Sequence, residues 1–242
     1  MAQDHIVKSF DDELAKLNRT IAQMGGLAEA QLQSAVQALV RRDPELAASI
    51  VKADKRIDEL EVQVGNLAVR MLALRQPMAS DLREVVAALK ISSDLERIGD
   101  YATNIAKRAI ALSEAPVIAT LHAIPRMAAL VQNIIKDVLD AYVAHDADRA
   151  MAAWQRDEEV DAMYTSLFRE LLTYMMEDPR NIGSCTHLMF IAKNIERIGD
   201  HATNVAELVY FLVHGHAMDQ ARPKGDTTNV AVPPMAQTSA HE

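Results

Sequence analysis

One acidic string occurs twice in the sequence, and its side chains are of a kind that binds metal ions. Residues 96–106 read ERIGDYATNIA and residues 196–206 read ERIGDHATNVA, so nine of 11 positions are identical. In each string a glutamate, an aspartate and an asparagine follow one another at intervals of four residues. Their oxygens are hard ligands, which suit Mg²⁺, Mn²⁺ or iron better than copper or zinc. The string therefore predicts a divalent metal site in each half.

Two aspartate pairs with the same spacing precede the strings. Asp54 and Asp58 correspond to Asp157 and Asp161 at an offset of 103 residues. Residues four apart lie on one face of a helix, where two carboxylates repel each other by roughly a few tenths of a kcal/mol. A bridging cation would remove that repulsion. The candidate metal ligands are Asp54, Asp58, Glu96, Asp100, Asn104, Asp157, Asp161, Glu196, Asp200 and Asn204.

The expected helix order brings these pairs to one height. If the last two helices of the first half fold antiparallel about Pro77, the numbers of facing residues sum to about 154, by reflection at equal rise per residue. The aspartate pair of that half then lies level with Glu96 and Asp100. The same reflection about Pro179 predicts the equivalent arrangement in the second half.

Other roles for these side chains stay open. Acids on an exposed helix face are commonly solvated or paired with basic neighbours, here Lys55, Arg56 and Arg97. Asn104 and Asn204 could bind metal or hydrogen-bond a neighbouring helix. The duplication favours the metal hypothesis, because a solvated surface is normally free to vary and here it is copied together with the core.

Two further positions of the strings bear on the prediction. Gly99 and Gly199 lie in mid-helix, where glycine costs about 1 kcal/mol relative to alanine. Each therefore marks either close helix packing or close approach by a partner or a metal. His201 replaces Tyr101 and points to the opposite flank of its helix from Asp200, so we do not count it as a ligand.

The elements that must hold these side chains are helices. Apolar residues recur at helical spacing in three stretches of each half. Asp43-Pro44 is typical of an N-cap followed by proline at the first helical position, whereas Gln76-Pro77 and Asp178-Pro179 end helices. The expected helices span residues 14–39, 44–76, 91–112, 125–145, 146–177 and 181–214.

This order predicts an all-α protein made of two tandem three-helix bundles related by internal duplication. Residues 1–114 form the first bundle and residues 115–216 the second. Residues 217–242 are rich in proline, threonine, glutamine and small side chains, which indicates a disordered C-terminal tail.

Composition narrows the class of protein. Hydrophobic residues make up 50% of the 242-residue chain and aromatic residues only 4%, which is typical of tightly packed helices. The net charge of −9, without a basic patch, argues against nucleic-acid binding. Cys185 is the single cysteine, as expected in a reducing cytoplasm. We find no apolar run of about 18 residues and no signal-peptide core, so we expect a cytoplasmic protein that reaches a membrane only through partners.

The doubled string resembles the PhoU family, the phosphate-specific transport system accessory proteins. The resemblance runs from about Phe10 to His214 and includes Met24-Gly25-Gly26. It implies two three-helix bundles, in agreement with the periodicity. It also implies that Glu/Asp-x-x-x-Asp motifs bind metal ions or clusters on the bundle surface. All four motifs are intact here, at Asp54–Asp58, Glu96–Asp100, Asp157–Asp161 and Glu196–Asp200.

The resemblance further implies a regulatory adaptor rather than an enzyme. Such proteins restrain phosphate-starvation signalling when phosphate is plentiful, and link the phosphate ABC transporter, through its ATPase subunit, to a sensor histidine kinase. We expect bound Mg²⁺, Mn²⁺ or iron, and a homodimer. One alternative is a metal-free helical scaffold. Another is a di-metal carboxylate oxidase, but such sites use inward-facing Glu-x-x-His pairs, which neither predicted bundle contains.

Overall fold

The computed structural model describes residues 2–115 and 122–219, with side chains from Phe10 onward. Within these ranges the chain forms helices joined by short turns and contains no strand, which confirms the all-α prediction. The predicted disordered tail lies outside the described residues from position 220 onward. The helices are α1 (Ala2–Arg41), α2 (Pro44–Ala53), α3 (Lys55–Arg75), α4 (Ser80–Leu112), α5 (Ala123–Ala144), α6 (Ala147–Gln155), α7 (Asp157–Glu177) and α8 (Ile182–His214), with a 3₁₀ turn, η2, at Pro179–Asn181.

The two halves repeat the same order of helices, and corresponding residues begin and end them. Asp43 caps α2 by accepting a hydrogen bond from the Leu46 backbone N–H at 2.8 Å. Asp146, 103 residues later, caps α6 by accepting from the Arg149 N–H at 2.9 Å. Gln76 leaves α3 in the left-handed region, with φ at 47°. The predicted caps and proline breaks therefore lie where the sequence places them.

The second helix of each half is broken, unlike the single helix that the apolar period predicts. The break falls at Asp54 between α2 and α3, and at Arg156 between α6 and α7. At each joint a backbone N–H bonds three residues back, Ile57 to Asp54 and Glu159 to Arg156, which tightens the helix as in a 3₁₀ turn. The first aspartate of each pair therefore lies at or beside a kink.

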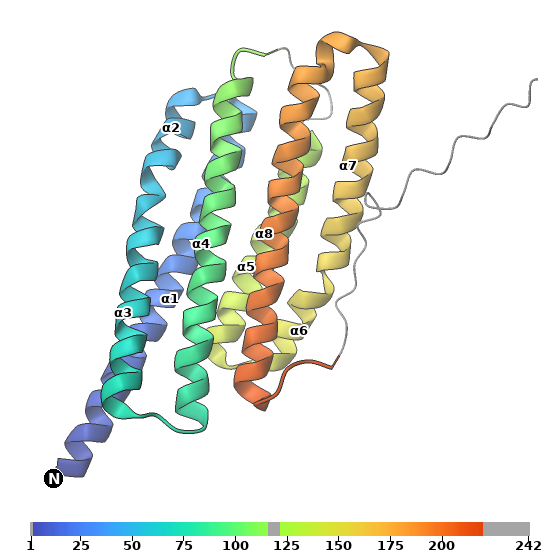
Figure 1. Cartoon of the computed structure of the whole chain (residues 1–242). Helices are drawn as coiled ribbons and strands as arrows, with labels where there is room; N and C mark the ends of the chain where they lie inside the picture. The colour runs from blue at the N-terminus through green and yellow to red at the C-terminus, as the bar shows by residue number, and fades with distance from the viewer. Residues whose placement is uncertain (1, 116–121, 220–242) are drawn as a thin grey trace, which may run out of the picture.

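The last helix of each half forms the centre of the molecule. α4 packs against α1, α2 and α3, and α8 packs against α5, α6 and α7. The halves join because α4 packs on α8 and α1 on α5; α4 and α8 run antiparallel, side by side (Figure 1). Buried aliphatic residues such as Ile98 and Ile198 fill the space between the helices. Each copy of the string therefore lies on the helix that packs against all the other helices of its half.

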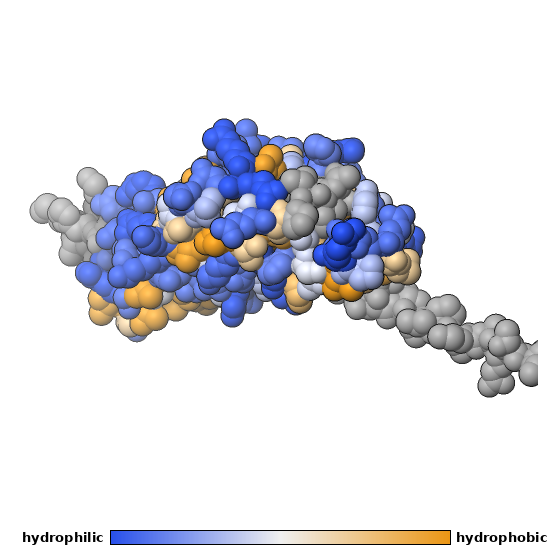
Figure 2. Space-filling model, turned by 90° about the horizontal axis from the view of Figure 1, so that it is seen from above, coloured by the Kyte–Doolittle hydropathy of each residue, from blue (hydrophilic) through white to orange (hydrophobic). Residues whose placement is uncertain are grey.

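Seen from above, hydrophilic side chains predominate and hydrophobic ones gather in small groups (Figure 2). Across the described ranges, no helix combines the length and apolarity needed to cross a bilayer.

Candidate metal centres

In the first half, the acids of α3 and α4 lie together on what we call the first acidic surface: Asp54, Asp58, Glu61, Glu96 and Asp100. Gly99 brings the two helices close there. A Cβ atom at Gly99 would lie 2.9 Å from Ile57 Cδ1 and 3.3 Å from Asp54 Oδ1. The reflection about Pro77 is therefore confirmed, and Gly99 serves close helix packing.

The carboxylates of this surface influence one another's ionisation. Burial, followed by the charges of Asp100 and Glu61, raises the pKa of Glu96 to about 7. Partial desolvation, then Asp54 and Asp100, raises the pKa of Asp58. Acids from two helices thus share one negative environment, which a bound cation would relieve.

Gln31 of α1 holds the aspartate at the kink. Its buried Nε2 donates to Asp54 Oδ1 at 2.9 Å and to Thr103 Oγ1 at 2.6 Å. The sequence analysis missed this residue. The available signal is a polar side chain within the apolar stripe of α1, between Ala28 and Ala35.

In the second half, four acids form what we call the second acidic surface: Asp157, Asp161, Glu196 and Asp200. This surface is more buried, with Asp157, Asp161 and Glu196 only 2%, 4% and 5% exposed. A Cβ atom at Gly199 would lie 3.4 Å from Asp157 Oδ1, an ordinary contact. The aspartate is therefore level with the string, as predicted, although the steric need for glycine is weaker than at Gly99.

A lysine that the sequence analysis missed enters the second surface. Lys193 Nζ lies 2.7 Å from Glu196 Oε1 and 4.8 Å from the centre of the Tyr164 ring. Glu196 Oε2 is buried and has no hydrogen-bond partner. Burial raises the pKa of Glu196 to about 6, while Lys193 lowers it and Asp200 and Asp161 raise it.

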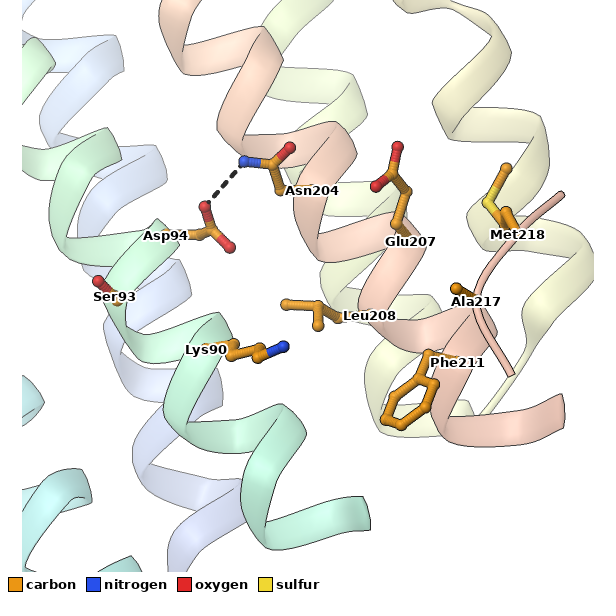
Figure 3. A pocket seen from close by; sticks show the side chains of 9 residues that line it. All are labelled: Lys90, Ser93, Asp94, Asn204, Glu207, Leu208, Phe211, Ala217 and Met218. Carbon is orange, nitrogen blue, oxygen red and sulfur yellow. Dashed lines mark hydrogen bonds between the residues drawn. The ribbon is translucent and has the colours of Figure 1, made fainter. Parts of the chain in front are cut away.

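The asparagine of the second string contacts the neighbouring helix. Asn204 Nδ2 donates to Asp94 Oδ1 at 3.1 Å, across the contact between α8 and α4 (Figure 3). His201 Nδ1 lies 2.8 Å from the same oxygen, which confirms that His201 faces away from the acidic surface. The Asn204 amide thus binds the neighbouring helix, the alternative left open above. Asn104 is half-buried, and a ligand role for either asparagine stays a prediction.

Part of the negative charge is paired with arginine. Arg97, whose side chain is 56% exposed, lies 3.7 Å from Glu96 and 3.5 Å from Asp100. Lys55 and Arg56 pair with Glu59, which is not one of the candidate ligands. Exposed pairs of this kind contribute ~0–1 kcal/mol and are easily exchanged.

The oxygen ligands fit a hard divalent cation in type, although they are not gathered around one point. Among residues 2–115 and 122–219, no three His, Cys, Asp or Glu side chains enclose a metal position. Repulsion spreads neighbouring carboxylates that share no counter-ion. The buried, unpartnered Glu196 Oε2 is an acceptor that a cation would satisfy. Metal binding would therefore require these side chains to rotate toward the ion.

An open pocket of about 600 Å³ lies elsewhere, between α4, α8 and the residues after α8. Lys90, Asp94 and Glu207 line it together with Phe211 and Met218 (Figure 3). Its lining contains none of the acids of the two acidic surfaces, although it includes Ser93, three residues before Glu96 on α4.

Fold and site together define a duplicated, all-helical protein that carries a carboxylate-rich surface on each half. A sequence profile of the PhoU domain matches residues 21–109 and again residues 124–209. The chain belongs to the PhoU family, as the doubled string predicts.

Individual relatives extend the match over most of the chain. The phosphate-specific transport system accessory protein PhoU homolog of Caulobacter vibrioides is 54% identical over 224 residues, which cover 92% of this chain and 97% of that protein. The homolog from Rhizobium meliloti is 50% identical over 230 residues, 95% and 97% of the two chains. The crystal structure of PhoU from Pseudomonas aeruginosa superposes with a TM-score of 0.82 at 42% identity, covering 86% of this chain and all of that one.

Proposed function

We propose that this protein is a regulatory accessory protein of a phosphate-specific transport system. In this role it restrains phosphate-starvation signalling by linking the ATPase subunit of the phosphate ABC transporter to a sensor histidine kinase. It works in the cytoplasm, as a homodimer, by binding rather than by catalysis. The observation that carries the proposal is the similarity of both halves to PhoU proteins, whose names include phosphate transport.

The acidic surfaces are the proposed regulatory element. Divalent cations, Mg²⁺, Mn²⁺ or iron, bind there and join α3 to α4 and α7 to α8. In support, Glu96 and Asp100 share a negative environment with the acids of α3, and Glu196 presents a buried oxygen without a partner. A cation would connect helices that otherwise repel each other through these acids.

A metal-free scaffold is the second candidate function. It is favoured by Arg97, which already pairs with Glu96 and Asp100. In that case the helical frame alone presents the partner-binding surfaces, and the acids serve solubility.

The test exchanges Glu96, Asp100, Glu196 and Asp200 for alanine in the full chain. Expression of phosphate-starvation genes is then followed in phosphate-rich medium, in cells whose own copy carries the changes. Loss of repression is expected, because the cation-binding oxygens are removed from both surfaces. Repression as strong as in the wild type would favour the metal-free scaffold.

A matched control removes the same amount of charge elsewhere. Asp11, Asp12, Glu45 and Asp148 are exposed acids outside both surfaces. Their joint replacement by alanine should leave repression intact. If the control also loses repression at equal protein level, net charge rather than cation binding explains the first result.

A further inference from the structure

The two acidic surfaces can be compared position by position through the internal repeat. The offset is 103 residues from α1 through α3 and 100 residues between α4 and α8. Lys193 on α8 therefore corresponds to Ser93 on α4, and Tyr164 on α7 corresponds to Glu61 on α3. At one of these positions the second surface has a cation where the first has a serine. At the other, the first surface has an acid where the second has an aromatic ring.

The cation of the second surface lies against a carboxylate and an aromatic ring. Its ammonium group lies 2.7 Å from Glu196 Oε1, within the range of a charge-assisted hydrogen bond. The face of the Tyr164 ring lies 4.8 Å away, a distance at which an aromatic ring stabilises a cation. Asp161 and Asp200 add negative charge around Glu196. Lys193 is therefore placed by the fold among the acids that the metal prediction assigns to a divalent ion.

We propose that Lys193 is a built-in cation that competes with divalent metal at the second acidic surface, so that the first surface is the one that binds metal readily. This inference rests on the proposed cation binding at the acidic surfaces. A metal ion approaching Glu196 must displace the ammonium group or bind beside a like charge, and both reduce its affinity. The first surface has Ser93 at this position, and the cation that pairs with its acids, Arg97, is exposed and exchangeable.

Lys193 satisfies only part of the Glu196 carboxylate, so it substitutes for a metal ion incompletely. Lys193 engages Oε1, whereas Oε2 stays buried without a hydrogen-bond partner. An ion that displaced Lys193 would satisfy both oxygens. The second surface is therefore a latent site, open to metal once Lys193 is removed.

The experiment exchanges the two corresponding residues. Lys193→Ser gives the second surface the residue of the first, and Ser93→Lys gives the first surface the residue of the second. Each substitution is made in the full chain, and the purified protein is freed of metal by chelator and dialysis. Mn²⁺ binding is followed by titration, using the electron paramagnetic resonance signal of free Mn²⁺. Lys107→Ser, at an exposed position of α4 outside both surfaces, controls for the change in net charge.

A background variant isolates the second surface. In Glu96→Gln, Asp100→Asn protein, Mn²⁺ binding should be weak, and Lys193→Ser should tighten it at least ~tenfold, the equivalent of ~1.4 kcal/mol. In the otherwise wild-type chain, Ser93→Lys should weaken Mn²⁺ binding by at least the same factor. Lys193→Gln, which keeps a donor for Glu196 without the charge, replaces Lys193→Ser if that variant does not fold.

The outcomes separate this inference from the proposed function. Suppose that the wild type binds Mn²⁺ at its first surface, but that Lys193→Ser leaves the Mn²⁺ affinity of the second surface unchanged in the Glu96→Gln, Asp100→Asn background. That result overturns the inference and leaves the proposed function intact. If neither the wild type nor Lys193→Ser binds Mn²⁺, the proposed metal function fails and the inference fails with it.

Discussion

The two acidic surfaces are built from nearly the same string but have different physical characters. The first is partly accessible to solvent, contains five carboxylates and has the exposed Arg97 paired with two of them. Three of the four acids of the second are buried, and Lys193 forms an ion pair with one of them, Glu196. The difference comes from residues outside the string, such as Gln31, which binds Asp54, whereas the corresponding position in α5 is Ile134. A copied motif therefore fixes where oxygens lie, while its neighbours decide their charge and accessibility.

The largest expected effect comes from removing the internal cation. Lys193→Ala leaves the buried Glu196 carboxylate without its ammonium partner, so the free energy of unfolding should fall by about 2 kcal/mol at ~pH 8. Burial holds the pKa of Glu196 at about 6, up from 4.5. At ~pH 4 the carboxyl group is protonated in both proteins, and the loss should nearly vanish. Urea denaturation at both pH values measures it.

Ser93→Ala is the control at the corresponding position of the first surface. It should change the free energy of unfolding by less than about 0.5 kcal/mol at either pH, because Ser93 is exposed. A Lys193→Ala loss of the same size at ~pH 4 as at ~pH 8 would show that packing, rather than charge, explains the effect.

A smaller effect, of opposite sign, is expected at the first surface. The pKa of Glu96 rises from 4.5 to about 7 on folding, so the native state binds more protons in that window and its stability falls as pH rises through it. Glu96→Gln cannot ionise. It should therefore gain roughly 1 kcal/mol at ~pH 8 in the presence of chelator, after allowance for solvent screening, and nothing at ~pH 4.

The same change at the second surface sharpens the comparison. Glu196→Gln should gain less than Glu96→Gln at ~pH 8, because it also removes the ion pair with Lys193. A larger gain at Glu196 than at Glu96 would contradict the different characters assigned to the two surfaces. The measurement is again urea denaturation of metal-free protein.

Much of the fold could be predicted because its signals are local. Proline at positions 77 and 179, the Asp43 cap and the apolar period define helix ends without knowledge of the tertiary structure. The level arrangement of the acids then follows from helix geometry alone. The breaks at Asp54 and Arg156 lack such a signal, since neither glycine nor proline marks them.

Most partners of the acids could not be read from the string, because they depend on contacts between helices. Lys193 is the exception, because it lies three residues before Glu196 on the same helix, a spacing at which helical side chains meet, so this pair could have been read from the sequence. Glu61 lies on another helix, outside the copied segment. The Asn204–Asp94 bond joins residues 110 apart, across the two halves. The Asn204 amide can bind Asp94 only because α8 packs on α4.

The smallest effect concerns the two glycines, whose surroundings differ. A methyl group at Gly199 would make ordinary contacts of 3.4–3.7 Å, so Gly199→Ala should gain about 0.5–1 kcal/mol from helix propensity. At Gly99 the methyl group would press on Ile57 at 2.9 Å and on Asp54 at 3.3 Å. Ile57 is buried, so its shift should cancel that gain. Thermal unfolding should therefore rank Gly199→Ala above the wild type and Gly99→Ala at or below it, and the reverse order would mean that α3 lies further from α4 than α7 from α8.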